Sequence, residues 1–503
     1  MHVSLVQRLD VVVARAPDAA ALAWHGIAWT YRDLGHAVGI VRAALAARYI
    51  PRGAAVAILL RNSPHYVATF YGVMAAGCVA VPLNVHESAA VLKHQIEHSE
   101  ARLVAGDPAH PEWSAIAATA ERLQIGLLAI STVDGPDCLE SFARDVGAAD
   151  GDAAGAASGE HDLAAIIYTS GTTGQPKGVM LSHGNLASNA AAIAEYLRLR
   201  PADRGLCVLP LTFAYGNSVL HSHLLAGARL SLEEHLAFPH LVLQRIQDEA
   251  ITGFPGVPAT FAVLLTRCRT GDFDLTSLRY VTQAGGPMPA ALMQRLRREL
   301  PKVEIFVMYG QTEATARLTY LPPERLDDKQ GSVGVPISGV DVSIRQIDRS
   351  FPGGTSGEIC VRGPNVMLGY WKDALATTAV LRDGWLHTGD LGHVDREGYL
   401  YIDGRIVEMI KVGAYRVSPM EIEEAIALLP GVADVAAVAV PDDLLGHAIK
   451  AVIVPATGAT LDIRAVKAHC RQRLAKYKIP RIVEFVDALP RTASGKVQRR
   501  RLA

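Results

Sequence analysis

A string rich in glycine, hydroxyl side chains and lysine follows an apolar run of the chain: Tyr168-Thr169-Ser170-Gly171-Thr172-Thr173-Gly174-Gln175-Pro176-Lys177-Gly178. Glycines let backbone N–H groups converge, hydroxyls add donors and a lysine supplies positive charge, which together suit a phosphate group. The string is not the Walker pattern, because Gln-Pro-Lys rather than Lys-Ser/Thr follows its second glycine. An ordinary surface turn is the alternative, but the length and composition of the string favour a phosphate-binding loop.

Three further strings carry side chains that suit a nucleotide. Tyr309-Gly310-Gln311-Thr312-Glu313 follows the apolar run 304–308, and ligand contacts commonly lie at the carboxyl end of a strand. Tyrosine can stack on a purine, threonine can bond a phosphate, and glutamate is a hard oxygen ligand for Mg²⁺. Ala284-Gly285-Gly286-Pro287-Met288 permits close backbone approach, and the aspartate of Thr388-Gly389-Asp390 can accept hydrogen bonds from two vicinal hydroxyls. Each of these, taken alone, is equally well a surface carboxylate or a turn.

The elements that must position these strings alternate along the chain. Short apolar runs alternate with helical stretches, which indicates parallel sheets covered by helices. The runs are 54–60, 77–83, 163–168, 206–209, 278–282 and 304–308. Between residues 331 and 398 the helical pattern fades and turn signals separate short strands, which predicts a small β-rich, β-barrel-like subdomain.

Composition excludes several classes of protein. The chain has 503 residues, of which 50% are hydrophobic, so we expect at least two domains with large cores and not a disordered chain. The formal net charge of −1 argues against nucleic acid or anionic membrane as a partner. The sequence has no apolar run long enough for a transmembrane segment, and residues 1–17 resemble an amphipathic helix rather than a signal peptide. Six cysteines without a C-x-x-C pair predict reduced thiols and a cytoplasmic location.

Charge is distributed unevenly along the chain. Residues 405–503 hold 16 basic and 10 acidic residues, a net of +6, which leaves a net of −7 for residues 1–404 (33 basic, 40 acidic). A basic terminal unit indicates either a surface that faces phosphates or an acidic partner, or a solvated helical surface, and charge alone leaves both open.

Taken in order from Trp29 to Leu502, the strings resemble the motif set of the adenylate-forming enzymes, which include acyl- and aryl-CoA synthetases, adenylation domains of peptide synthetases and luciferases. The resemblance implies a phosphate loop and a nucleotide site. The implied phosphate-loop residues are Thr169, Ser170, Gly171, Thr172, Thr173, Gly174 and Lys177. The other implied nucleotide contacts are Gly286, Pro287, Tyr309 and Gly310 at adenine, Thr312 at the α-phosphate, Asp390 at the ribose, and Arg405 near the ribose and phosphates.

The same resemblance implies the catalytic groups and the domains. Thr312, Glu313 as the magnesium ligand, and Lys496 in the string 489–497 are the implied catalytic residues; Lys496 reaches the active site as the acyl-adenylate forms. The fold implied is α/β, with a large N-terminal AMP-binding and acyl-substrate domain at 1–404 and a smaller, mobile α+β C-terminal domain at 405–503. Rotation about Val407 would then present the implied pantetheine tunnel, Gly413, Ala414 and Tyr415.

The acid that the protein activates is bounded by its predicted pocket. The resemblance implies that a domain activating an α-amino acid places an aspartate after a pocket phenylalanine, to pair the substrate ammonium. Here Ala214 follows Phe213, which disfavours an α-amino acid. A mostly apolar pocket predicts a fatty or aryl acid, and its expected residues are Phe213, Tyr215, Gly216, Ala284, Gly285 and Met308. Arg317 could pair a second carboxylate or a polar group of the acid, but a surface arginine on a helix is the favoured interpretation. His221 and His223 are interpreted as surface or pocket histidines and not as zinc ligands.

These observations predict an ATP-dependent acid–thiol ligase that adenylates a carboxylic acid, releases pyrophosphate and transfers the acyl group to CoA. An alternative acceptor is the phosphopantetheine of a free-standing acyl carrier protein, and a homodimer stays open. A non-catalytic ATP or AMP sensor is the alternative from another class. Glu313, Asp390 and Lys496 together argue against the sensor, since binding alone does not require all three.

Overall fold

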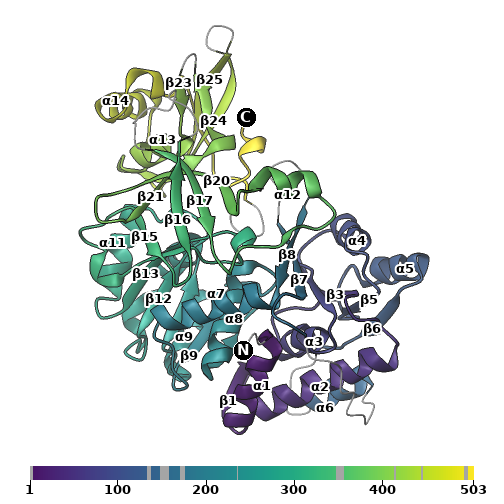
Figure 1. Ribbon diagram of the computed structural model, residues 1–503. Helices are drawn as coiled ribbons and strands as arrows, with labels where there is room; N and C mark the ends of the chain where they lie inside the picture. Colours follow the sequence, from purple (N-terminus) through teal and green to yellow (C-terminus); the bar gives the residue numbers. More distant parts are fainter. Residues whose placement is uncertain are drawn as a thin grey trace.

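The computed structural model describes residues 4–132, 138–147, 158–169, 176–234, 236–346, 356–412, 415–442, 446–491 and 497–503. Three sheets with helices packed against them form a mixed α/β fold (Figure 1). Two of the sheets build a large N-terminal body, and a third lies at the opposite end of the molecule. None of the described helices combines the length and the apolar character needed to cross a bilayer.

The seven-stranded sheet carries the base of the predicted phosphate loop. Its order is β18-β8-β7-β4-β3-β5-β6, and all pairs from β7 to β6 are parallel. The strands are β3 (Ala55–Leu59), β4 (Val79–Pro82), β5 (Leu103–Gly106), β6 (Gly126–Ala129), β7 (Leu163–Thr169), β8 (Lys177–Ser182) and β18 (Gly369–Tyr370). The helices of this part are α2 (Tyr31–Ala47), α3 (Pro64–Ala75), α4 (Ala89–His98), α5 (Trp113–Leu123) and α6 (Cys138–Val146).

A longer, fourteen-stranded sheet carries the other site strings, and its middle strands β12 and β13 are parallel neighbours. Its parallel part contains β1 (Ala20–Trp24), β9 (Arg204–Cys207), β10 (Arg229–Leu232), β11 (Gly253–Gly256), β12 (Tyr280–Gln283) and β13 (Glu304–Tyr309), with β2 (Ile27–Thr30) antiparallel at the edge. The helices are α1 (Leu5–Arg15), α7 (His183–Tyr196), α8 (Ala214–Ala226), α9 (Pro239–Asp248), α10 (Pro258–Arg267) and α11 (Ala290–Glu299).

The β-rich segment predicted at 331–398 is present as antiparallel strands. These are β15 (Ser332–Pro336), β16 (Asp341–Arg345), β17 (Gly357–Arg362), β19 (Leu381–Arg382) and β20 (Trp385–Val394), with helix α12 (Ala374–Val380) among them. Together with β14 (Thr319–Leu321) and β21 (Leu400–Arg405), they continue the long sheet in the order β16-β17-β20-β21-β15-β14-β13. Among the described strands this path stays open at β16.

The chain after β21 forms a smaller α+β unit at the end of the molecule that lies at the top of Figure 1. Its strands are β22 (Ile410–Val412), β23 (Tyr415–Val417), β24 (Val432–Asp442), β25 (Gly446–Pro455) and β26 (Ile482–Phe485), and its helices are α13 (Pro419–Ala427) and α14 (Ile463–Arg473). A separate apolar core, which includes Ile422, Ile449 and Val466, holds it together. The domain limits at 404 and 405 stay a prediction.

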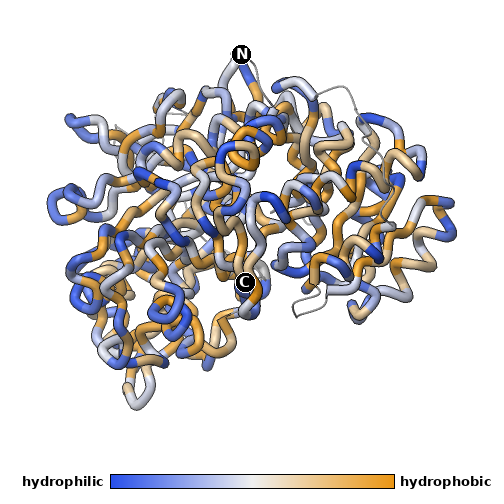
Figure 2. The backbone as a smooth tube through the Cα atoms, turned by 90° about the horizontal axis from the view of Figure 1, so that it is seen from below, coloured by the Kyte–Doolittle hydropathy of each residue, from blue (hydrophilic) through white to orange (hydrophobic). Residues whose placement is uncertain are grey.

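Packing follows the hydropathy of the elements. Apolar segments run through the interior, whereas hydrophilic segments mark loops and outer helical faces (Figure 2). Helix α2 begins at a capping box in which Thr30 accepts from the Asp33 N–H and Asp33 accepts from the Thr30 N–H. All six cysteines are free thiols, and only Cys268 is partly exposed.

Candidate active site

Three predicted nucleotide contacts from three strands meet at one carboxylate. Tyr309 ends β13 and its hydroxyl donates to Asp390 Oδ2 at 2.6 Å. Arg405 ends β21, and its Nε donates to Asp390 Oδ1 at 2.8 Å. The register of the antiparallel pair β20–β21 sets Asp390 opposite Arg405, so the ion pair follows from strand pairing.

The carboxylate of Asp390 shifts the pKa values of the two residues that bond to it. Asp390 is buried, and its carboxylate raises the pKa of Arg405. Burial, and then the same carboxylate, raise the pKa of Tyr309 well above its usual range, so the phenol keeps its proton and remains a donor. The cluster therefore holds one carboxylate, that of Asp390, by hydrogen bonds to both of its oxygens. Asp390 is the residue that the resemblance assigns to the ribose.

The loop after β13 is held in one backbone conformation. A side-chain carbon on Gly310 would lie 1.8 Å from the Ala316 carbonyl oxygen, so only glycine fits this close approach. Asn365 Nδ2 donates to the carbonyl oxygens of Ala314 and Arg317, at 3.1 and 2.9 Å. The short 3₁₀ helix η2 (Thr312–Ala314) lies inside this anchored loop and carries both Thr312 and Glu313.

Glu313 is joined to the base of the predicted phosphate loop by Tyr370, which the sequence analysis did not identify. The Tyr370 hydroxyl donates to Glu313 Oε1 at 2.8 Å, and Lys177 Nζ lies 4.9 Å from the centroid of the Tyr370 ring. Tyr370 takes this place because β18 pairs with β8, and Thr169 pairs with Lys177 at the end of the β7–β8 pair where the chain passes from one strand to the other. Burial, and then Glu313, raise the pKa of Tyr370, so it stays a donor.

The residues around Glu313 fit a magnesium ion. None of the described lysines or arginines forms an ion pair with its carboxylate, which is only partly buried. Among the described residues, a hydrogen bond reaches only the oxygen Oε1 of this carboxylate, and a carboxylate oxygen is the ligand type that Mg²⁺ takes beside substrate phosphates.

The predicted acyl pocket divides into a packed part and an exposed turn. Tyr215, Ala284 and Met308 contact one apolar cluster, and the Tyr215 hydroxyl donates to the Thr282 carbonyl at 2.9 Å. Phe213 is the partly buried N-cap of α8. Gly216 is buried in the first turn of that helix, where a side-chain carbon would lie 2.3 Å from the Pro210 carbonyl oxygen.

The turn 285–287 is exposed beside this pocket. Gln283 Nε2 fixes it by donating to the Gly286 carbonyl at 2.7 Å, and Gly285 adopts a φ of +86°. The turn therefore leaves the backbone of Gly286 and the ring of Pro287 accessible at the carboxyl end of β12.

The structure contradicts the interpretation of Arg317, and for His221 and His223 it contradicts the surface alternative. Arg317 is neither on a helix nor at the surface: it lies in the loop before β14 and is 2% exposed. His221 and His223 are also buried, because helix α8 is covered on nearly every side. Their rings bond tyrosines: His221 Nδ1 lies 2.7 Å from the Tyr71 hydroxyl, and His223 Nε2 lies 2.9 Å from the Tyr280 hydroxyl.

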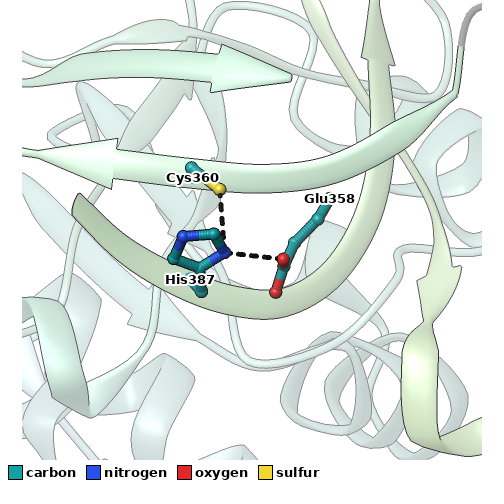
Figure 3. Close-up of side chains that lie close together, drawn as sticks. All are labelled: Glu358, Cys360 and His387. Carbon is teal, nitrogen blue, oxygen red and sulfur yellow. Dashed lines mark hydrogen bonds and ion pairs between the residues drawn. The ribbon is translucent and has the colours of Figure 1, made fainter. Parts of the chain in front are cut away.

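A further cluster, Glu358, Cys360 and His387, braces the strand that carries Asp390 (Figure 3). His387 Nδ1 lies 2.7 Å from Glu358 Oε2 and 3.4 Å from Cys360 Sγ, and Glu358 Oε1 accepts from the Gly389 N–H at 3.3 Å. Burial, and then Glu358, raise the pKa of Cys360 to about 11. The hydrogen bonds of the cluster position residues 387–390.

Several predicted residues lie outside the described part of the chain: Ser170, Gly171, Thr172, Thr173, Gly174, Gly413, Ala414 and Lys496. For Tyr415 and Val407 only the backbone is described, in β23 and in the 3₁₀ helix η4 (Ile406–Glu408) respectively. The roles of all these residues stay predictions.

Comparison with known proteins gives two family matches and many relatives along the full chain. The profile of the AMP-binding enzyme family matches residues 9–371, and that of the AMP-binding enzyme C-terminal domain matches residues 421–496. Feruloyl-CoA synthase from Amycolatopsis sp is 37% identical over 486 residues, which is 96% of this chain and 95% of that protein. Indoleacetate–CoA ligase from Aromatoleum aromaticum is 42% identical over 338 residues, or 66% of this chain and 65% of that protein.

A solved structure shares the fold along nearly the whole chain. o-Succinylbenzoate coenzyme A synthetase from Bacillus subtilis, in complex with ATP and magnesium ion, superposes with a TM-score of 0.86. It is 29% identical, and the match covers 98% of each chain.

Proposed function

The chain belongs to the AMP-binding enzyme family, and from this premise we propose that it is an ATP-dependent, AMP-forming ligase that joins a carboxylic acid to the thiol of CoA. The observation that carries the proposal is the convergence of two side-chain sets at the end of β13. One is the Tyr309–Asp390–Arg405 cluster, and the other links Glu313 to Lys177 through Tyr370.

In the first half-reaction, a carboxylate oxygen of the acid attacks the α-phosphorus of ATP, and the bond to pyrophosphate breaks. We assign Asp390 to the two ribose hydroxyls, Tyr309 to the adenine face and Thr312 to the α-phosphate. By the same assignment, Lys177 and the string before it would bind the outer phosphates. A magnesium ion held by Glu313 would supply charge neutralisation on the phosphate oxygens. Lys496 would stabilise the charge that accumulates as the acid attacks.

In the second half-reaction, the CoA sulfur attacks the acyl carbon, the thiol proton is released and AMP leaves. Rotation of the C-terminal unit about Val407 would withdraw Lys496 and present Gly413, Ala414 and Tyr415 to the pantetheine arm. One site could then serve two different chemical steps.

The pocket indicates which class of acid the enzyme activates, and the charge of the C-terminal unit bears on the acceptor. Tyr215, Ala284 and Met308 supply apolar walls, and two relatives are named for aryl acids, ferulate and indoleacetate, so we propose an aryl acid ahead of a fatty acid. The net charge of +6 over residues 405–503 supports an acidic carrier protein as the alternative acceptor. Six free thiols support a cytoplasmic location.

The experiment that tests the function measures AMP and pyrophosphate with ATP, Mg²⁺ and a panel of aryl, fatty and dicarboxylic acids, each with and without CoA. Turnover that requires CoA is the expected result. A single turnover that CoA does not relieve, but that a carrier protein does in a salt-sensitive manner, would select the alternative acceptor. If the protein bound ATP but released no pyrophosphate with any acid, the non-catalytic ATP or AMP sensor would be the remaining interpretation.

Replacing Asp390 by asparagine should raise the KM for ATP by about tenfold to a hundredfold, which corresponds to about 1.4–2.7 kcal/mol. Asparagine keeps the shape of the side chain and can accept one hydrogen bond, but it leaves Arg405 without its counter-ion. Asp341→Asn is the matched control, because it removes one partner of an exposed Asp–Arg pair that lies outside the site, with side chains 62% and 58% exposed. Steady-state kinetics with varied ATP measures both variants, and equal effects would contradict the role of Asp390.

Lys496→Ala should lower the rate of adenylate formation by about a hundredfold to a thousandfold, since it removes one charge from the transition state. Thioester formation from supplied acyl-adenylate should be nearly unchanged. Pyrophosphate exchange and a thioester assay measure the two half-reactions separately. Lys476→Ala, in the exposed 3₁₀ helix η5 (Lys476–Lys478), is the control for loss of a basic residue. A comparable loss in both half-reactions would refute the assignment.

A further inference from the structure

Arg317 is a charged side chain fixed inside the protein. It is 2% exposed, and its carbonyl oxygen accepts two hydrogen bonds, from Asn189 Nδ2 at 3.0 Å and from Asn365 Nδ2 at 2.9 Å. These bonds attach the backbone of Arg317 to helix α7 and to the segment before β18. The backbone from which the Arg317 side chain extends is therefore fixed by parts of the chain that are far apart in sequence.

The guanidinium group of Arg317 contacts two residues of the proposed acyl pocket. Its central carbon lies 4.0 Å from the centroid of the Tyr215 ring, and its Nε donates to Met308 Sδ at 3.2 Å. Met308 is the residue before Tyr309 on β13, and Tyr215 is bonded to Thr282 at the end of β12. The guanidinium thus lies beside the carboxyl ends of two parallel strands, where ligands of such sheets bind.

The neighbours of Arg317 do not neutralise its charge. The guanidinium also forms a hydrogen bond with the side chain of Tyr196. A thioether is a weak acceptor, a phenol hydroxyl carries no charge, and an aromatic face compensates a cation only in part. No carboxylate among the described residues forms an ion pair with Arg317. Three arginines that are more exposed all have such partners: Arg245 pairs with Glu233 and Glu249, Arg229 pairs with Glu249, and Arg279 pairs with Asp203.

An arginine that is buried without an anion is costly unless an anion binds there. We propose that this anion is a second carboxylate on the acid substrate, so that the enzyme activates a dicarboxylic acid and Arg317 determines its specificity. One carboxyl group would react at the α-phosphate, near Thr312 and Glu313. The other would meet the planar guanidinium fork, which binds a carboxylate through two parallel N–H···O bonds. The inference rests on the proposed ligase function and narrows its substrate class.

The experiment compares three forms of each acid in aryl and alkyl series of graded length: the monocarboxylic acid, the dicarboxylic acid, and the mono-methyl ester of the dicarboxylic acid. The ester keeps the size of the second group but removes its charge. The readout is kcat/KM for AMP formation in the wild type, Arg317→Met and Arg317→Lys. The affinity for ATP, measured by titration without acid, shows whether the nucleotide site is intact.

We expect the wild type to prefer the best dicarboxylic acid over its monocarboxylic and ester counterparts by about a hundredfold or more. Arg317→Met should reduce this ratio to about one, and Arg317→Lys should retain part of it, because lysine keeps the charge without the fork. A merely structural role would lower kcat/KM for all three forms in proportion and leave the ratio unchanged.

Equal use of the three forms by the wild type, or an unchanged ratio in Arg317→Met, would overturn the inference while leaving the ligase function in place. Failure of the wild type to form AMP with every acid would instead overturn the ligase function, and the inference with it. The ratio in the wild type decides the question even where a variant does not fold.

Discussion

Replacing Glu313 by glutamine is expected to lower kcat/KM for AMP formation by about a thousandfold or more, which corresponds to about 4 kcal/mol. Glutamine has the same shape, and its carbonyl oxygen can still accept the hydrogen bond that Glu313 Oε1 receives from Tyr370. The change therefore removes one negative charge and little else. Because Mg²⁺ requires hard, anionic oxygen ligands, the variant should also need a much higher magnesium concentration for half-maximal activity.

Two variants separate the charge of Glu313 from its orientation. Tyr370→Phe removes the hydrogen bond but keeps the carboxylate, so we expect a loss of only about tenfold. Glu324→Gln removes a carboxylate from the exposed position 324 in the 3₁₀ helix η3 (Pro323–Arg325) and should have no effect on kcat/KM. Magnesium titrations of AMP formation measure all three. If Tyr370→Phe lost as much activity as Glu313→Gln, the orientation of the carboxylate rather than its charge would be decisive.

The parts of the site that the sequence predicts are those encoded in short contiguous strings. Tyr309, Thr312 and Glu313 follow an apolar run, and that run is strand β13, so the local pattern was sufficient to place them at a strand end. Asp390 and Arg405 were also predicted from their strings. Their ion pair depends on the register of the β20–β21 hairpin, which the strings do not specify.

Tyr370 and Arg317 could not be interpreted in this way, because long-range contacts determine their roles. Tyr370 reaches Glu313 only because β18, a strand of two residues, pairs with β8, and so short a strand leaves no periodic pattern. Arg317 is buried by Tyr215, which comes from a helix much earlier in the chain. A charged residue has a low prior for burial, so the sequence favoured the wrong interpretation.

The buried histidines should make the folded chain unstable in mild acid. Burial lowers the pKa of His65, His183 and His223 to about 4 and that of His221 to about 3. In the unfolded chain each has a pKa of about 6.5. Between pH 6.5 and about 4 the unfolded state therefore binds protons that the folded state does not, and the free energy of unfolding falls as the pH falls. At pH 5 each histidine lowers the free energy of unfolding by about 2 kcal/mol, and the four together lower it by up to about 8 kcal/mol.

Asp10, Glu423 and Glu424 act in the opposite direction, because burial raises the pKa of each carboxyl group and the folded state takes up their protons first. They reduce the total, but a loss of several kcal/mol remains comparable with the whole stability of a typical domain. Thermal and denaturant midpoints should consequently decrease steeply from pH 6.5 to pH 5 and change little between pH 7 and pH 8.

His221→Gln tests whether burial causes this dependence. Glutamine offers an amide to the Tyr71 hydroxyl but does not titrate. In the variant, unfolding between pH 6.5 and pH 5 should therefore take up about one proton fewer than in the wild type. His161→Gln is the matched control, because the His161 side chain is 90% exposed and its removal should leave the slope unchanged. Denaturant midpoints across the pH range provide the slopes. Identical slopes in the wild type and in His221→Gln would show that acid lability arises elsewhere, and the carboxyl groups of Asp10, Glu423 and Glu424 could not supply it, since their shifts act in the stabilising direction as the pH falls.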